Sequence, residues 1–201
     1  MNSFEISGLY NVPDKKDTTG KFQHYLKTKD VVLCLCYQPP GLQYNHPNSG
    51  FGTFSQAVYV VDGSYTCKPF FRASGLNRDT KEEDILHIKE GEFVNLEYLQ
   101  NVVTHDTAGP NGAMMIHVNP LSGQPDFNFE FIGPNETKNI ITTDKRKIVF
   151  CFKEEVYVNG VELSLLNRVR LKYDSETLIE VGESGACLVM ENRIATKPQT
   201  I

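Results

Sequence analysis

Residues 156–190 read VYVNGVELSLLNRVRLKYDSETLIEVGESGACLVM, and this stretch decides the fold class. Short apolar runs alternate with polar residues at period two, which is typical of half-buried strands. Asn159-Gly160 lies between two such runs and predicts a two-residue hairpin, because a type I′ turn needs positive φ at both central positions. The runs that follow, 169–173, 177–181 and 187–190, predict three further short strands.

The same pattern extends through the rest of the chain. Val31–Tyr37 is a continuous apolar run, and Phe127, Phe129 and Phe131 alternate with polar residues. Asp62-Gly63 between 57–61 and 64–71 predicts a second hairpin. Strands at roughly ten-residue spacing, with turn residues between them, favour a sandwich or barrel. We expect an all-β, double-sheet jelly roll.

Helices are not expected. The best helical candidate, 83–89, has apolar spacing that fits a strand equally well, and the charged segment 75–84 predicts an exposed loop or at most one helical turn.

Composition narrows the class of protein. The 201 residues carry a formal net charge of -5, with 40% hydrophobic and 22% charged residues, which is ordinary globular usage. A mildly acidic surface repels phosphate backbones, so nucleic acid is not an expected partner. The tight basic run Lys145-Arg146-Lys147 follows Asp144 and predicts a solvated turn.

Cysteine usage and apolar runs predict the compartment. The five cysteines include no CxxC pair and lie in apolar, strand-like segments, which indicates buried reduced thiols in a cytoplasmic protein. No apolar run reaches 18 residues, so no membrane span is expected. Met1–Tyr10 contains Glu5 and has no basic region before an apolar run, so we expect no secretory signal.

Two pairs of segments suggest an internal repeat. AVYVVDG at 57–63 begins a hairpin, as does IVFCFKEEVYVNG at 148–160. GAMMIHVN at 112–119 matches GACLVMEN at 185–192 in position and residue type. A structural repeat and a chance likeness between hairpins both remain open.

These stretches resemble the cupin family of jelly rolls. QAVYVVDGSY at 56–65 is similar to the end of the first cupin motif, and 156–190 is similar to the closing half of a cupin barrel. The resemblance implies a double-stranded β-helix of RmlC type. If the repeat is real, the chain is a compact bicupin with an N-terminal half 1–125 and a C-terminal half 126–201; the alternative is a single β domain, 1–201.

The resemblance also implies a metal set, and here the match fails. A cupin usually holds a metal with two or three histidines and a glutamate. Counting back from Gly63, the position of that glutamate is occupied by Gln56, and the segment SGFGT at 49–53 has no histidine. His105 is a candidate for the histidine of the second motif, but the proline and glycine that usually frame it are missing. We therefore expect no cofactor.

An alternative metal site remains open. His46, His105 and His117 would bind a divalent transition metal such as iron, zinc or nickel if they converged, with Asp106 orienting the imidazole of His105. Scattered histidines carry no spacing signal, and His117 lies in a strand where a structural histidine is the commoner outcome.

Aromatic residues between 37 and 54 suggest a ligand-binding rim. Tyr37, Tyr44, Phe51 and Phe54 are predicted to surround the mouth of a barrel, with Gln56 just after them. Aromatic faces beside amide groups suit a small polar molecule or a carbohydrate. The alternative is a packed surface loop that covers the barrel end.

Three functional hypotheses follow. The first is a cupin-like protein with a non-catalytic role in small-ligand binding or assembly. The second is a metal-dependent cupin enzyme of the isomerase or dioxygenase type, and the third is a viral structural or interaction protein. A homo-oligomer is compatible with each. No Gly-x-Ser-x-Gly occurs to support nucleophilic catalysis.

Overall fold

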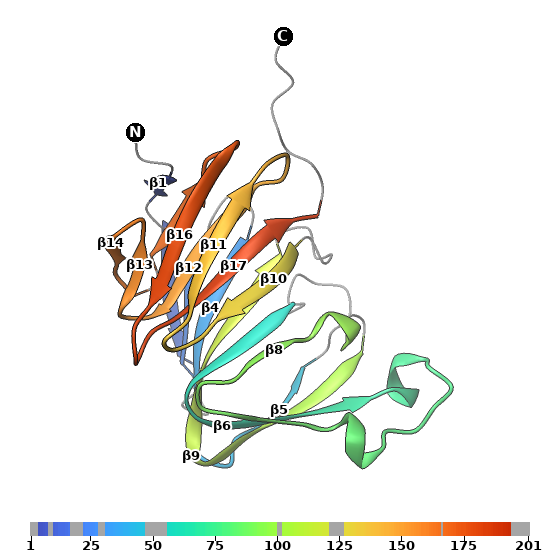
Figure 1. Ribbon diagram of the computed structural model, residues 1–201. Helices are drawn as coiled ribbons and strands as arrows, with labels where there is room; N and C mark the ends of the chain where they lie inside the picture. Colours follow the sequence, from blue (N-terminus) through green and yellow to red (C-terminus); the bar gives the residue numbers. More distant parts are fainter. Residues whose placement is uncertain are drawn as a thin grey trace. The chain divides into compact units, whose positions relative to one another are not determined.

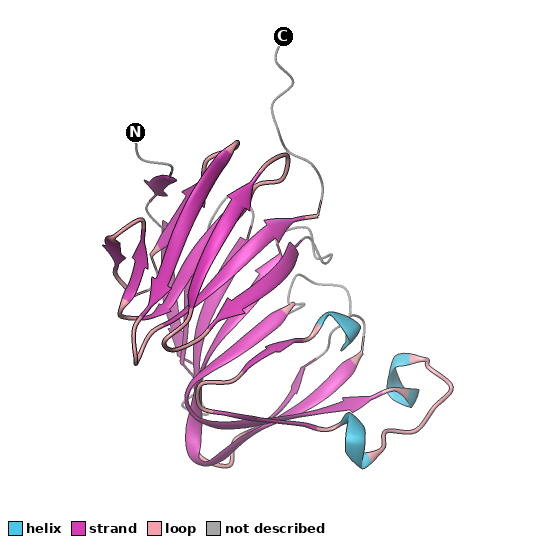
Figure 2. Cartoon of the chain, in the orientation of Figure 1, coloured by secondary structure: helices cyan, strands magenta, loops and turns pink. Residues whose placement is uncertain are grey.

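The computed structural model describes residues 4–7, 10–16, 22–27, 31–46, 56–99, 102–120, 127–165 and 167–193. Nearly all regular structure in these ranges is β-strand, and three short 3-10 turns are the helical elements (Figure 2). The predicted all-β fold class is confirmed. The chain divides into two compact units: an N-terminal unit, Tyr10–Pro125, and a C-terminal unit, Met1–Leu9 together with Asp126–Ile201.

The C-terminal unit contains two antiparallel sheets (Figure 1). One has the spatial order β1 (Phe4–Ser7), β15 (Arg168–Leu171), β12 (Lys147–Lys153), β17 (Ala186–Asn192) and β10 (Phe127–Ile132). The other has the order β11 (Thr137–Thr142), β16 (Ser175–Val181), β13 (Val156–Val158) and β14 (Val161–Leu163). Strand β1 pairs with β15, so the start of the chain joins the unit formed by its last third. Whether the two units are repeats of one another stays a prediction.

Aliphatic side chains fill the core of the C-terminal unit. Val149 lies between Val169 and Val189 in a row across three strands of the first sheet. Val158 and Ile179 form a matching pair on the second sheet, and all five residues belong to one buried cluster. The alternation of buried and exposed residues along β16 directs Ile179 inward. The cluster consists of aliphatic and cysteine side chains.

The N-terminal unit is built on one long sheet. Its spatial order is β2 (Tyr10–Lys16), β3 (Phe22–Lys27), β4 (Val31–Gln38), β9 (Val103–Pro120), β6 (Ala57–Phe70) and β7 (Leu86–Lys89). Strand β5 (Gln43–His46) also pairs with β9, and β8 (Phe93–Asn95) pairs with β6. Because β9 pairs with β4, β5 and β6, it determines which side chains of these strands face the same core.

The two predicted hairpins have different outcomes. Asn159 and Gly160 adopt φ of 49° and 74° between the paired strands β13 and β14, so that prediction is confirmed. The prediction of a hairpin at Asp62-Gly63 is wrong, because β6 continues through both residues. The register against β9 shifts on either side of them, which makes this point a β-bulge. Gly63 uses its positive φ of 78° to kink the strand rather than to reverse it.

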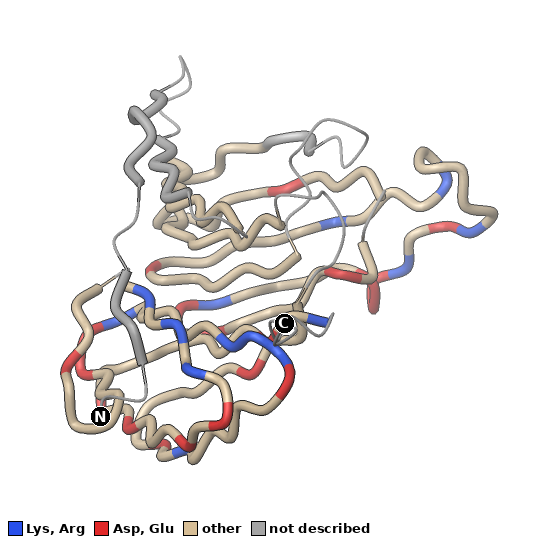
Figure 3. The backbone as a smooth tube through the Cα atoms, turned by 90° about the horizontal axis from the view of Figure 1, so that it is seen from above, with Lys and Arg blue, Asp and Glu red and all other residues tan. Residues whose placement is uncertain are grey.

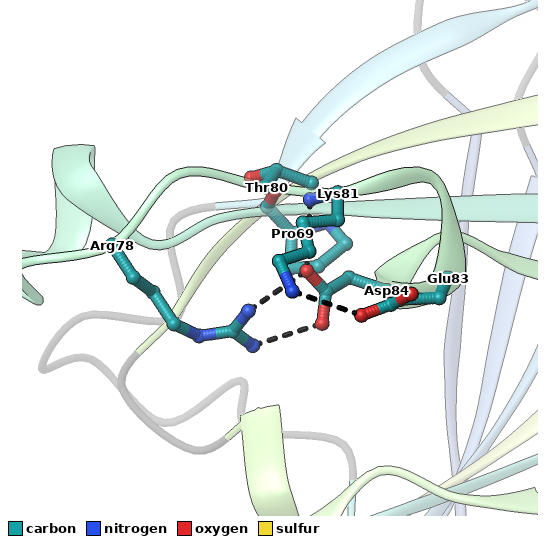
Figure 4. Close-up of polar contacts among 6 residues, drawn as sticks. All are labelled: Pro69, Arg78, Thr80, Lys81, Glu83 and Asp84. Carbon is teal, nitrogen blue, oxygen red and sulfur yellow. Dashed lines mark hydrogen bonds and ion pairs between the residues drawn. The ribbon is translucent and has the colours of Figure 1, made fainter.

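The charged segment between β6 and β7 is an ordered loop that projects from the sheet (Figure 1). It contains the 3-10 turns η1 (Arg72–Ser74) and η2 (Glu82–Asp84), while η3 (Glu97–Leu99) follows β8. The Arg78 guanidinium donates to both carboxylate oxygens of Asp84 at 2.8 and 2.9 Å (Figure 4). It also lies over the Phe71 ring, 3.5 Å from the ring centroid. The hydrogen bonds from Arg78 and from the backbone N–H of Lys81 hold the pKa of Asp84 below its ordinary value. The expected exposed loop is therefore held by its own ion pair.

Basic and acidic residues are interleaved along the described chain (Figure 3). Two lysines of the basic run 145–147 form ion pairs with Glu191. Nζ of Lys145 lies 3.4 Å from Oε1 of Glu191, and Nζ of Lys147 lies 3.1 Å from its Oε2. Within the described ranges, no helix has the length and apolar character needed to cross a membrane.

Candidate functional site

Five buried residues of the N-terminal unit form a group that we call the Asp106 cluster: Tyr65, Cys67, Thr104, Asp106 and His117. Tyr65 and Cys67 lie on β6, and the other three lie on β9. Cys67 is the register partner of Asp106, so the two side chains leave the sheet on the same face. All five residues are buried.

Hydrogen bonds connect the cluster. The Tyr65 hydroxyl and the Cys67 thiol both donate to the Asp106 carboxylate, and Thr104 hydrogen-bonds to Cys67. The His117 ring meets the Tyr65 ring edge-on, with centroids 6.3 Å apart and an interplanar angle of 86°. The cluster is therefore a single connected group drawn from two neighbouring strands.

The donors of the cluster keep their protons at neutral pH. Burial raises the pKa of Tyr65 well above its ordinary value, and the charge of Asp106 raises it further. Burial is also the largest cause of the raised pKa of Cys67, and the charge of Asp106 is the second. Because a thiol reacts as its thiolate, Cys67 is a hydrogen-bond donor here and not an activated nucleophile.

Within the described part of the chain, Oδ1 of Asp106 is a buried acceptor without a hydrogen-bond partner, and so is Oε1 of Gln38, the last residue of β4. Both residues are only 2% exposed. A buried acceptor without a donor costs about 1–3 kcal/mol. Such atoms are suited to receive hydrogen bonds from a bound molecule.

The residues predicted to form the ligand-binding rim lie in different environments. Tyr37 is half-buried on β4, opposite Met114 of β9. Gln56 is fully buried before β6, where its backbone N–H donates to Val118 and its carbonyl accepts from Leu96, both at 2.8 Å. Tyr44 lies on β5 at the register position opposite Asp106. Phe51 and Phe54 lie outside the described residues, so the rim stays a prediction.

The predicted histidine site is only partly described. His105 is the neighbour of Asp106 on β9, and adjacent strand residues point to opposite faces. His105 meets the ring of Phe70 on its own face, whereas His117 belongs to the buried cluster. The described residues thus do not bring His105 and His117 together, and His46 is placed only by its register position opposite Thr104.

The described ranges contain no set of donor side chains that fits a metal ion. No group of three or more His, Cys, Asp or Glu side chains there has an arrangement that could hold a metal ion. Asp106, which the sequence suggested as a partner of His105, instead accepts hydrogen bonds from Tyr65 and Cys67. The three-histidine site stays a prediction, and we derive no chemistry through a metal.

Sequence reasoning did not identify the Asp106 cluster as a site. In THDTA at 104–108, polar residues occupy both faces of β9, so periodicity does not tell which of them points inward. The signal that could have found it is the pairing of Cys67 with Asp106 across two strands, and this requires the register of β6 against β9.

Buried thiols and phenols predict a loss of stability at alkaline pH. Burial raises the pKa of Cys151 and of Tyr59 to about 12, and it also raises those of Cys67, Cys187 and Tyr65. Because these groups hold their protons to higher pH in the folded state, their stabilising contribution is complete below the unfolded pKa, which is about 9 for a thiol and about 10 for a phenol. It is lost as the pH rises from that value towards the folded pKa. We expect each buried thiol to cost roughly 1 kcal/mol of unfolding free energy at pH 10.

Urea unfolding at pH 7.5, 9 and 10 would measure this loss. The Cys151→Ala variant should lose stability less steeply above pH 9 than the unaltered protein does. A midpoint that stays constant between pH 7.5 and 10 would contradict the expectation.

Solved structures share this arrangement of strands over most of the chain. A conserved protein of unknown function from Pseudomonas aeruginosa PAO1 is 10% identical, with a TM-score of 0.62 over 92% of this chain and 98% of its own. An oxalate decarboxylase from Lactobacillus farciminis, solved as a formate complex, is 8% identical, with a TM-score of 0.59 over 96% and 88%. The bacterial pirin YhhW from Escherichia coli, solved with nickel(II), is 9% identical, with a TM-score of 0.53 over 90% and 94%.

These neighbours are cupin-family proteins. The chain has a cupin fold. The predicted resemblance is thereby confirmed, and identities this low establish the fold alone. A scan against protein-family models finds no match, and a search of curated proteins finds no similar sequence. Function in this cupin-fold protein must therefore be argued from its own residues.

Proposed function

We propose that this cupin-fold protein binds a small polar molecule at the Asp106 cluster of its N-terminal unit, and that the C-terminal unit has a structural role. The difference between the two cores carries the proposal. The C-terminal unit buries a cluster of aliphatic and cysteine side chains, and its buried polar residues, Thr142, Arg168 and Thr177, include no carboxylate within the described part of the chain. The N-terminal core contains a connected polar group around the buried carboxylate of Asp106, and within the described part of the chain Oδ1 of Asp106 and Oε1 of Gln38 have no hydrogen-bond partner. Ligand sites typically combine apolar walls with a few such polar groups.

Thermal unfolding in the presence of a ligand panel tests this function. The panel contains monosaccharides, polyols, small amines and small carboxylates, each at millimolar concentration. A ligand present at 100 times its Kd should stabilise the folded state by about 2.7 kcal/mol and raise Tm measurably. We expect at least one member to do so.

A matched pair of variants tests whether the ligand binds at Asp106. Asp106→Leu removes the buried acceptor, whereas Asp62→Leu changes an exposed aspartate on the same unit. The ligand-induced rise in Tm should disappear in the first variant and persist in the second, with circular dichroism confirming that both are folded. A rise that survives in Asp106→Leu would remove the proposed site.

A metal-dependent cupin enzyme is the second candidate, favoured by the nickel(II) complex of the pirin. It would require His46, and residues outside the described ranges, to complete a donor set. Near-stoichiometric iron, zinc or nickel in the purified protein, lost in His105→Ala, would favour this candidate over the first.

A further inference from the structure

Two of the five cysteines lie opposite each other in the C-terminal unit. Cys151 on β12 is the register partner of Cys187 on β17, and both belong to the same buried cluster. Burial raises the pKa of Cys187, and the charge of Cys151 raises it further, which places the two thiols close together. Within the described strand pairings, the other three cysteines, Cys34, Cys36 and Cys67, have no cysteine as a register partner.

The backbone shows which kind of pair the two cysteines form. In an antiparallel ladder, opposite residues alternate between hydrogen-bonded and non-hydrogen-bonded pairs, and the second kind brings the side chains closer. The N–H of Cys151 donates to the carbonyl of Asn167 at 3.0 Å, on the side of β15 and not of β17. On β17, the N–H of Asn192 points to the β12 side, where it donates to Arg146 at 2.9 Å. Because Cys187 is an odd number of residues earlier, its N–H points away from β12, so both strands indicate a non-hydrogen-bonded pair.

This geometry suits a disulfide. Opposite residues in a non-hydrogen-bonded pair have Cα atoms about 4.5 Å apart. Disulfides occur at Cα separations of about 4.4–6.8 Å, so a bond between Cys151 and Cys187 is within reach in the native register. The commonest separation is about 5.5–6 Å, so this bond would carry strain, and strained disulfides are the ones that are readily reduced.

We infer that Cys151 and Cys187 form a reversible cross-strand disulfide when the protein meets a disulfide oxidant such as oxidised glutathione. One thiolate attacks the glutathione disulfide, which releases one glutathione thiol and leaves a mixed disulfide. The second thiolate then displaces the remaining glutathione. The two cysteines lose two protons and two electrons in all, and one glutathione disulfide becomes two thiols. This modification is independent of ligand binding at the Asp106 cluster.

Burial determines when the bond forms. Both cysteines are fully buried, and burial raises the pKa of Cys151 to about 12, so the closed fold protects the thiols from oxidants. The register of β12 against β17 shifts between Cys151 and Lys153, directly beside the pair. A bulge interrupts the ladder, so the two strands separate most easily at this point. We therefore expect the disulfide to form during local opening, after which it ties together the ends of the segment that contains β13 to β16.

Incubation with oxidised glutathione tests the inference. The protein is held in urea just below its unfolding midpoint, so that local opening is frequent, and a parallel sample contains dithiothreitol instead. Free thiols are then alkylated, and tryptic peptides are identified by mass spectrometry. We expect the peptide that contains Cys151 to be joined to the peptide that contains Cys187, with two of the five thiols protected from alkylation. Later addition of dithiothreitol should release both.

Three variants identify the pair. Cys151→Ala and Cys187→Ala should each abolish the linked peptide, whereas Cys34→Ala, which removes a buried cysteine of the N-terminal unit, should keep it. Circular dichroism establishes that each variant is folded. The cross-link should also raise the urea midpoint of the C-terminal unit by about 1 M, in the unaltered protein and in Cys34→Ala.

Three results would overturn the inference. The first is that all thiols remain free after incubation, and the second is a linkage that joins other cysteines. The third is a linked form whose urea midpoint does not rise, because the bond would then not fit the native register of β12 and β17.

Discussion

Replacing Ile179 by alanine should lower the free energy of unfolding of the C-terminal unit by about 2–5 kcal/mol. Ile179 is fully buried on β16, where it pairs with Val158 and belongs to the aliphatic cluster that fills this unit. Truncation removes buried methyl and methylene groups and leaves a cavity that a close-packed core fills only in part. Urea unfolding followed by far-UV circular dichroism would show the midpoint moving to lower urea.

Ile141 supplies the matched control. It lies on β11, next to β16 in the same sheet, and is 63% exposed. Ile141→Ala removes the same atoms from the surface and should change stability by no more than about 0.5 kcal/mol. Equal losses in the two variants would mean that the cluster around Ile179 does not hold the unit together.

Local alternation made most of this fold predictable. In β16, the buried residues Thr177, Ile179 and Val181 alternate with exposed neighbours, and this is the pattern from which a strand was expected over 177–181. The Asn159-Gly160 turn was also predictable, since residues adjacent in the chain supply both its dihedral angles and its strand pairing. These features need no information from distant segments.

Features that depend on a partner strand were not predictable. Asp62-Gly63 carries the same local signal as Asn159-Gly160, but β9 continues to pair with β6 on both sides of it, which turns the expected reversal into a bulge. The Asp106 cluster has the same origin. His105 and Asp106 are equally polar neighbours, and only the register against Cys67 shows that Asp106 faces the core. The sequence therefore pointed to the histidine, while the structure points to the aspartate.

The bulge gives the second large effect, since Gly63→Ala should destabilise the N-terminal unit by roughly 2–5 kcal/mol in all. Gly63 has φ of 78°, where a side chain costs about 1–2 kcal/mol. A Cβ at this position would also lie 2.3 Å from the carbonyl oxygen of Gly112 on β9, so the backbone must shift, at a further cost of about 1–3 kcal/mol.

Gly160→Ala is the control. Its φ is 74°, but no atom lies within 4 Å of the added Cβ, so this variant should lose only the stability that the positive φ costs. The difference between the two unfolding free energies, measured in urea, isolates the close approach of β6 to β9. If the two variants lose the same stability, the bulge is not held by that contact.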